Sequence, residues 1–299
     1  GDVYKRQVLD KTKTAMGGRL LRAWMERPLL SPAQITRRLT AVEELVKKTI
    51  DREELILSLR EITDFERAMT RIMTGTASCR DLAALSQGAA SLPAVKERLS
   101  GMRSPYLQTL FEQLDTLADL KERIDATIVD DPPFLLREGG LIRDGANKEL
   151  DELRAVQSGG KGMLTQIEAR EKEKTGIRNL RVGYNRVFGY YIDVPNSAGL
   201  EKVPEEYIRK QTLVSSERYF TPELKELETT LLTARDRVNE LEYQYFTEVR
   251  LSVAEKVDRV QAAADAVARL DALCSLAETA VKNNYVCPEV DLSRTLDIR

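Results

Sequence analysis

A segment near the middle of the chain, residues 181–222, interrupts an otherwise helical pattern. On either side of Gly189, apolar residues occur at every second position. The two alternating sets are Leu180, Val182 and Tyr184, then Tyr190, Ile192 and Val194. This period predicts half-buried strands, because successive side chains of a strand point to opposite faces of a sheet. The glycines that bracket residues 184–188 favour a hairpin turn between them. A small β module between long helices is typical of a tip that grips something.

The composition excludes several classes of function. The 299 residues include no histidine, which removes Ser–His and Cys–His nucleophile pairs and histidine-based zinc sites. Cys79, Cys274 and Cys287 are far apart, which is typical of free thiols in a reducing cytosol. No apolar run approaches the roughly 18 residues that a membrane-spanning helix needs. We therefore expect a cytoplasmic protein without a membrane partner.

Charge is distributed unevenly along the chain. The net charge of the whole chain is −2, so any affinity for nucleic acid must come from a local patch. Residues 178–222 have the opposite balance, with seven Arg or Lys residues against five Asp or Glu residues. This excess of two positive charges also fits an ordinary mixed surface, and it does not decide between the two interpretations.

The first part of the chain predicts a helical core domain over residues 8–133. Helix starts are indicated at Ser31, at Asp51 and at Ser104, because each of these side chains can cap free backbone N–H groups. Pro32 and Pro105 follow two of them, at a helical position that needs no N–H donor. Residues 1–7 show no periodic pattern, and we expect them to be unstructured or non-native.

Two long helical arms are predicted on either side of the β module. The first arm covers residues 134–177, with its helix expected over residues 144–175. The second begins the stretch 223–282, after a helix-start signal at Thr221 and Pro222. Seven residues of the second arm recur at alternating spacings of three and four: Leu224, Leu227, Leu231, Ala234, Val238, Leu241 and Tyr245. That narrow seam favours antiparallel pairing with the first arm. The predicted fold is mainly α, with lever-like antiparallel helices carrying a small β-sheet at their tip.

No group of residues predicts catalysis or a cofactor site in this chain. Gly159, Gly160, Lys161 and Gly162 lack the spacing of a phosphate loop and do not follow a strand. We expect them to be a flexible or kinked point in the first arm. The remaining constellation consists of polar and basic residues in or beside the expected turns: Asn185, Arg186, Arg209, Lys210, Gln211 and Ser215. Such side chains are the usual partners of nucleic-acid phosphates.

Three functions remain open on these residues alone. In the first, the β module binds the backbone of DNA or RNA. In the second, it is a protein-contacting or purely structural tip at the end of a coiled-coil scaffold. An enzyme in its own right is the third and least supported possibility, because no nucleophile, base and oxyanion site come together.

Three motifs resemble the MutS family of bacterial DNA mismatch repair proteins. The run from Leu180 to Ile192, with residues 207–213 and 217–224, is similar to the clamp segment of that family. Residues 9–21 look like the opening of its core domain. Residues 283–288 look like the passage before its ATPase domain. The three motifs occur in the family's order and span the chain from about residue 8 to its end.

The resemblance implies a division of the chain and a role for each part. Residues 8–133 would be the core domain, residues 134–177 and 223–282 the lever, residues 178–222 the clamp, and residues 283–299 the start of a link to an ATPase domain. Clamps of this family hold a DNA duplex by its backbone without sequence preference. Asn185, Lys210, Gln211 and Ser215 match the DNA-facing segment, where the family often has asparagine at the position of Ser215.

The resemblance also implies properties of a longer parent protein. That protein would be a homodimeric, DNA-dependent ATPase that binds ATP and magnesium and works with a MutL-like repair partner on the bacterial nucleoid. The family's mismatch-sensing wedge and phosphate loop have no counterpart in this sequence. We therefore expect the chain itself to be non-catalytic and to have no cofactor.

Overall fold

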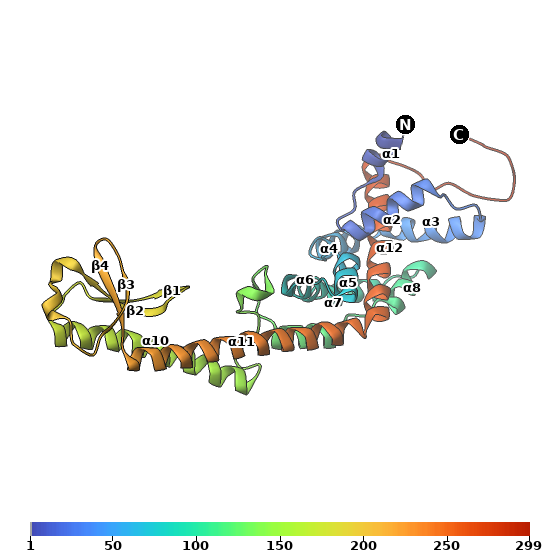
Figure 1. Cartoon of the computed structure of the whole chain (residues 1–299). Helices are drawn as coiled ribbons and strands as arrows, with labels where there is room; N and C mark the ends of the chain where they lie inside the picture. Colours follow the sequence, from blue (N-terminus) through green and yellow to red (C-terminus); the bar gives the residue numbers. More distant parts are fainter. Residues whose placement is uncertain (1) are drawn as a thin grey trace. The chain divides into compact units, whose positions relative to one another are not determined.

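The computed structural model describes residues 2–299, which form two compact units. Unit 1 contains the chain up to Arg143 together with residues 245–299, and unit 2 contains residues 144–244. The described chain is mainly α-helical with one four-stranded antiparallel sheet, which confirms the predicted fold class. Figure 1 shows the helices and strands of each unit.

Unit 1 is an array of helices around α12 (Val257–Lys282). Fourteen of the 26 residues of α12 are buried, and they lie on all sides of the helix. Several are alanines, so that neighbouring helices approach its axis closely. The helices of unit 1 that precede it are α1 (Asp2–Leu9), α2 (Ala15–Glu26), α3 (Pro32–Lys47), α4 (Thr49–Arg60), α5 (Phe65–Thr74), α6 (Cys79–Ala89), α7 (Leu92–Ser100), α8 (Pro105–Gln113) and α9 (Ala118–Thr127), with a 3₁₀ helix at Leu136–Glu138.

A buried carboxylate joins the two sequence segments of unit 1. Asp271 of α12 accepts hydrogen bonds from the backbone N–H groups of Lys13 (2.9 Å) and Thr14 (2.8 Å) and from the Thr14 hydroxyl (2.7 Å). A β-carbon on Gly17 would lie 2.1 Å from the same carboxylate, so glycine is required for this approach. Burial raises the pKa of Asp271, against the opposing effect of these hydrogen bonds. The N-terminal segment is thereby fixed to a helix more than 250 residues later.

The predicted helix starts are right at Ser31 and Ser104 and wrong at Asp51. Ser31 accepts a hydrogen bond from the backbone of Gln34, and Ser104 occupies the capping position before Pro105. Helix α4 instead begins at Thr49, two residues before Asp51. Asp51 lies inside the first turn, where a carboxylate is favoured by the positive end of the helix dipole without capping it.

The N-terminal segment also differs from expectation. Residues 2–7, expected to lack structure, belong to helix α1, while Gly1 lies outside the described residues. Helix α1 buries none of its residues, which explains why its sequence shows no amphipathic period. The Val8 and Leu9 carbonyls accept from the Thr279 hydroxyl and hold the end of α1 against α12.

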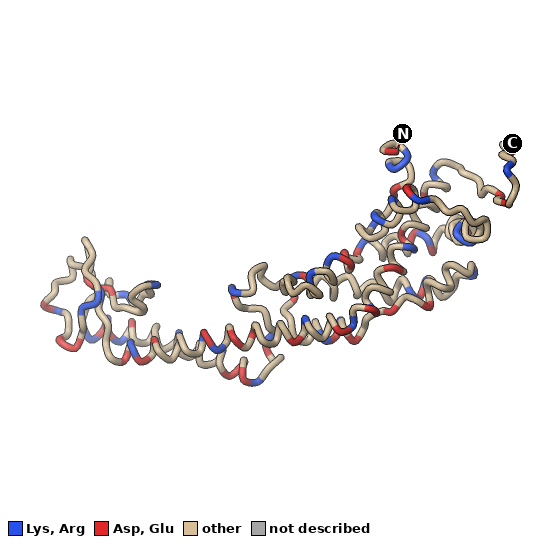
Figure 2. Tube along the Cα trace, turned by 45° about the vertical axis from the view of Figure 1, so that its right-hand side comes forward, with Lys and Arg blue, Asp and Glu red and all other residues tan. Residues whose placement is uncertain are grey.

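Unit 2 consists of two paired helices and the sheet. Helix α10 (Lys148–Thr175) pairs with residues 222–244 of α11 (Pro222–Ala254). The pairing is antiparallel, because Arg154 contacts Glu242 near one end of the pair and Arg170 contacts Glu223 near the other. Both helices carry Lys/Arg and Asp/Glu residues interspersed with uncharged ones (Figure 2). The sheet comprises β1 (Arg181–Asn185), β2 (Gly189–Pro195), β3 (Ile208–Thr212) and β4 (Ser216–Phe220), with 3₁₀ helices at Asn196–Ala198 and Leu200–Lys202.

Helix α10 departs from two expectations. It begins at Lys148, four residues after the expected start at residue 144. Residues 134–143, which were assigned to the first arm, belong to unit 1, where Ile142 bridges to Ile128. It also continues without interruption through Gly159, Gly160 and Gly162, which were expected to be flexible or kinked. A β-carbon on Gly160 would lie 2.2 Å from Leu231 of α11, so this glycine permits close helix packing.

The predicted seam of α11 is buried from Leu224 to Leu241. Its last predicted member, Tyr245, is only half-buried, and Phe246 is buried instead. Beyond residue 244 the helix packs within unit 1, so a different face is covered. The returning segment 223–282 is two helices, since residues 255–256 separate α11 from α12. Residues 283–299 contain no helix or strand.

Candidate nucleic-acid interface

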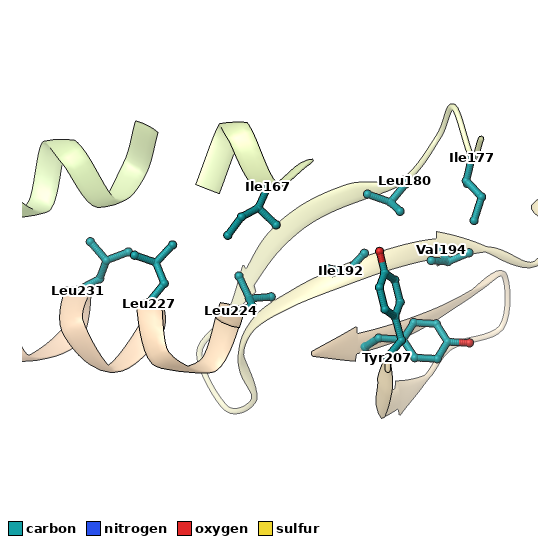
Figure 3. Close-up of a cluster of buried hydrophobic side chains, with 10 residues drawn as sticks. Ile167, Ile177, Leu180, Ile192, Val194, Tyr207, Leu224, Leu227 and Leu231 are labelled. Atoms are coloured by element: carbon teal, nitrogen blue, oxygen red, sulfur yellow. The ribbon is translucent and has the colours of Figure 1, made fainter. Parts of the chain in front are cut away.

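The four strands form a sheet in the order β1-β2-β4-β3, with every neighbouring pair antiparallel. The register places Ile192 opposite Tyr219 and Val194 opposite Glu217, on the face that packs against the helices. Leu224, Leu227 and Leu231 of α11 and Ile167 of α10 join Ile192 and Val194 of this face in one buried cluster (Figure 3). The outer face carries the alternate residues, among them Tyr191, Asp193 and Arg218. The period-2 pattern of the sequence therefore corresponds to a sheet with one covered face.

A buried hydrogen bond completes the inner core. The Tyr207 hydroxyl donates to Oε2 of Glu171 on α10 at 2.6 Å. Burial and the contact with this carboxylate both raise the pKa of Tyr207, so the phenol stays protonated and donating. Glu168, one turn earlier, accepts from the backbone of Val182 at 3.0 Å, which lowers the pKa of its carboxyl. Two carboxylates of α10 thus fix the orientation of the sheet on its helices.

The outer face holds Arg218, whose guanidinium group contacts the side chains of Tyr191, Asp193 and Gln211. The Arg218 guanidinium lies 4.1 Å from the ring centre of Tyr191. It donates to Asp193 (3.3 Å) and to the side-chain oxygen of Gln211 (3.1 Å). The predicted site residue Gln211 therefore orients Arg218, and its amide nitrogen remains on the outer face. Because Asp193 offsets the charge of Arg218, this pair adds little net positive charge to the surface.

The β1–β2 turn contains two of the predicted site residues. Asn185 accepts from the backbone N–H groups of Val187 (2.8 Å) and Phe188 (3.2 Å), so its oxygen shapes the turn. Arg186 is exposed at the apex and makes no hydrogen bond or ion pair within residues 2–299. Gly189 closes the turn at φ +80°, and a β-carbon there would meet the carboxylate of Glu228 on α11. The turn thus presents one unpaired cation on a rigid backbone.

The edge strand β3 carries Arg209 and Lys210 at a β-bulge. Arg209 pairs with Tyr219 and Gln211 with Arg218, which leaves Lys210 as the extra residue. Arg209 forms an ion pair with Glu217 at 3.3 Å. Lys210 is half-buried, and its Nζ lies 3.5 Å from the Tyr190 carbonyl and 5.3 Å from the ring centre of Phe220. Of these two cations, only Lys210 lacks a carboxylate partner within the described chain.

A second lysine meets the same ring. Nζ of Lys225, in the first turn of α11, lies 5.5 Å from the ring centre of Phe220. Sequence reasoning missed Lys225 because it sits beyond the β module on a helix. The only available signal was its position just after the helix start at Thr221 and Pro222.

The sixth predicted residue, Ser215, lies at the other end of the sheet. It is exposed in the β3–β4 turn, where its carbonyl accepts from the backbone of Asn196 at 2.9 Å. Strand β2 runs from the β1–β2 turn to this end, a separation of about 20 Å for seven residues at ~3.3 Å each. The structure brings Arg209, Lys210 and Gln211 together on one strand. It separates Ser215 from Asn185 and Arg186.

The described residues provide little for other chemistry. No group of three or more Cys, Asp or Glu side chains within residues 2–299 is arranged to hold a metal ion. Gly159, Gly160 and Gly162 lie inside helix α10, so their N–H groups cannot cradle a phosphate of ATP. No helix in this part of the chain combines the length and apolarity of a membrane span.

Comparison with known proteins identifies the family. Residues 6–277 match the family model described as MutS domain III. Three curated relatives carry the name DNA mismatch repair protein MutS. Those of Ruminiclostridium cellulolyticum, Acetivibrio thermocellus and Symbiobacterium thermophilum are 48%, 47% and 48% identical over 97%, 98% and 98% of this chain. The chain spans 33% of the length of each. The chain therefore belongs to the MutS family of DNA mismatch repair proteins.

Proposed function

We propose that unit 2 holds duplex DNA by its sugar–phosphate backbone, without reading sequence, within a MutS-like mismatch repair protein. The observation that carries the proposal is the set of cations without a carboxylate partner around the β1–β2 end of the sheet. Arg186, Lys210 and Lys225 belong to this set. Such cations bind phosphates and release counterions, which gives affinity without base recognition.

The predicted contacts have different roles in this proposal. Arg186 and Lys210 contact phosphates directly, and Ser215 donates a hydrogen bond to the backbone from the opposite end of the sheet. Asn185 fixes the turn that carries Arg186, and Gln211 orients Arg218 while its amide faces the duplex. Arg209, which is paired with Glu217, contributes least.

The helices have a mechanical role in the proposal. Helix α11 begins two residues after β4 ends and continues as one hydrogen-bonded helix into unit 1. In this proposal, a shift in the position of the sheet acts on α11, which has residues in both units. In the longer protein, this lever couples DNA grip to an ATP-dependent change of state. The proposal assigns ATP and magnesium binding, the homodimer, the MutL-like partner and the nucleoid location to that protein rather than to this chain.

Fluorescence anisotropy of labelled matched and mismatched duplexes tests the proposal. We expect weak binding that is equal for the two duplexes. If two to four phosphates are neutralised, log affinity falls with log salt at a slope of about −2 to −4. Binding that prefers the mismatched duplex, or no binding at low salt, would contradict the proposal. The coiled-coil scaffold with a protein-binding tip would then be favoured.

Lys210→Gln sharpens this test. We expect weaker binding to all duplexes alike and a salt slope flatter by about one unit, because one phosphate contact is lost. Lys282→Gln is the matched control, since Lys282 is an exposed lysine at the end of α12 without an ion pair in the described chain. An unchanged slope for Lys210→Gln would remove Lys210 from the interface.

A further inference from the structure

The junction between the sheet and α11 carries an unusual arrangement of charge. Phe220 is the last residue of β4, and Thr221, which follows it, caps α11 by accepting from the backbone of Leu224 at 3.2 Å. The half-exposed Phe220 ring receives Lys210 from the bulge of β3 and Lys225 from the first turn of α11. Two backbone elements that are 15 residues apart thus direct their ammonium groups to one aromatic ring.

The two ammonium groups repel each other in the free protein. Both are measured from one ring centre, at 5.3 and 5.5 Å, so they are at most about 11 Å apart. This upper bound slightly exceeds the Debye length of about 8–10 Å, so at the largest possible separation salt screens most of the repulsion. Within residues 2–299 neither lysine has a carboxylate partner. In contrast, Lys172 and Lys174 of the same unit pair with Glu168 and Glu206.

The ring and the bulge hold this pair in place. A cation over an aromatic face is attracted by the ring quadrupole, which restricts the otherwise mobile lysine side chains. The Tyr190 carbonyl, 3.5 Å from Lys210 Nζ, adds a second restraint on the bulge lysine. Phosphates of a DNA backbone bound beside these ammonium groups would be attracted by both charges. Two lysines without an ion pair in the described chain, held at one ring, therefore suit contact with a phosphate backbone.

We infer that Lys210, Phe220 and Lys225 form one anchor for the DNA backbone, in which Lys210 and Lys225 each contact a phosphate and Phe220 is a positioning residue. This inference rests on the proposed function and adds a residue from outside the β module to it. Because Lys225 belongs to α11 itself, the anchor attaches a phosphate directly to the lever helix. Contact with DNA then acts on α11 in two ways, through the first turn of the helix and through the sheet.

Single and double substitutions test the anchor in the duplex-binding assay. We expect Lys225→Gln to lower affinity about eightfold at ~0.1 M salt and to flatten the salt slope by about 0.9, as the loss of one phosphate contact requires. Lys210→Gln combined with Lys225→Gln flattens it by about 1.8. The matched control is Lys202→Gln, an exposed lysine of the same unit without an ion pair in the described chain.

Two substitutions of the ring test its positioning role. Phe220→Tyr keeps an aromatic face and retains wild-type affinity. Phe220→Leu keeps both charges and an apolar side chain, but it lowers affinity because the lysines lose their common support. Thermal unfolding of each variant identifies any that fail to fold. Equal affinity of the leucine and tyrosine variants would remove the positioning role from Phe220.

The outcomes separate this inference from the function on which it rests. No duplex binding by the wild-type chain overturns both. Binding that Lys210→Gln weakens, with Lys225→Gln indistinguishable from Lys202→Gln, overturns the anchor and leaves the proposed function standing. A flatter slope for Lys225→Gln together with an unchanged control supports both.

Discussion

Helices α12 and α10 have similar lengths and are stabilised in different ways. Helix α12 buries 14 of 26 residues, whereas α10 buries 4 of 28. A helix covered on all sides gains most of its stability from apolar burial, at about 25 cal/mol per Å². A helix with a thin apolar stripe depends on one partner and on surface ion pairs that contribute little each. The comparison teaches that most substitutions in α12, at the centre of unit 1, should destabilise the fold. In α10, destabilising substitutions should be confined mainly to the line of residues that contacts α11.

The largest expected effect is at the centre of unit 1. Asp271→Ala removes the acceptor for three hydrogen bonds from Lys13 and Thr14 and leaves buried donors unpaired. We expect a loss of about 3 kcal/mol in the free energy of unfolding. Urea unfolding followed by the fluorescence of Trp24, the chain's single tryptophan, measures it within unit 1. Asp258→Ala, at an exposed position of α12, is the control. A loss below 1 kcal/mol would show that α12 depends on apolar packing alone.

A smaller and pH-dependent effect is expected at Glu44. Burial alone would raise the pKa of Glu44, but hydrogen bonds from the backbone of Ser104 and Arg103 and from Lys48 outweigh it and lower the pKa to about 2. Its stabilisation is therefore fully present above the ordinary value of 4.5 and is lost as pH falls toward 2.

Glu44→Gln tests this dependence. The variant loses about 1–2 kcal/mol at neutral pH, because charge-assisted hydrogen bonds to two N–H groups weaken. The difference from wild type shrinks as pH falls below 4.5. Glu43→Gln is the neighbouring control, since Glu43 forms only an exposed ion pair with Lys47. A difference that stays constant down to the acid limit of the folded state would contradict the assigned pKa.

The smallest effects distinguish three glycines of α10. Gly159→Ala and Gly162→Ala place a methyl group in open space, and each stabilises the helix by about 0.5–1 kcal/mol. Gly160→Ala meets Leu231 and gains nothing or loses stability. Amide hydrogen exchange of α10 measures all three, because it reports local opening of unit 2. Equal gains at the three positions would mean that α10 has no close line of contact with α11.

The sequence predicted best what depends on local periodicity. The alternation around Gly189 and the spacing from Leu224 to Leu241 correspond to observed strands and to the buried seam of α11. Residues 134–143, which we assigned to the first arm, belong to unit 1, because the bridge between Ile128 and Ile142 depends on tertiary pairing that periodicity does not report. Tertiary packing also explains why Phe246 is buried in place of the predicted seam residue Tyr245. Helix α11 changes its packing partner at this point.

The candidate site was only partly predictable for a related reason. Residue types in turns pointed to Arg186 and Lys210 as candidates, but periodicity and motifs do not report the register of β3 and β4. Without that register, the bulge at Lys210 and its approach to Phe220 and Lys225 were not accessible. The distance between Ser215 and the β1–β2 turn could not be predicted either, because it follows from the order of strands in the sheet.

The late position of α12 in the chain has a consequence for synthesis on the ribosome. The helix that α2, α3 and α5 pack against is made after all of them and after the whole of unit 2. Lys13 and Asp271 are separated by 258 residues, which is roughly 10–50 s of translation at about 5–20 residues per second. During that interval the apolar faces of the first helices lack their central partner and are open to chaperones. Unit 2 is already complete in sequence by then, so it is able to fold before the unit that contains the chain's first residues.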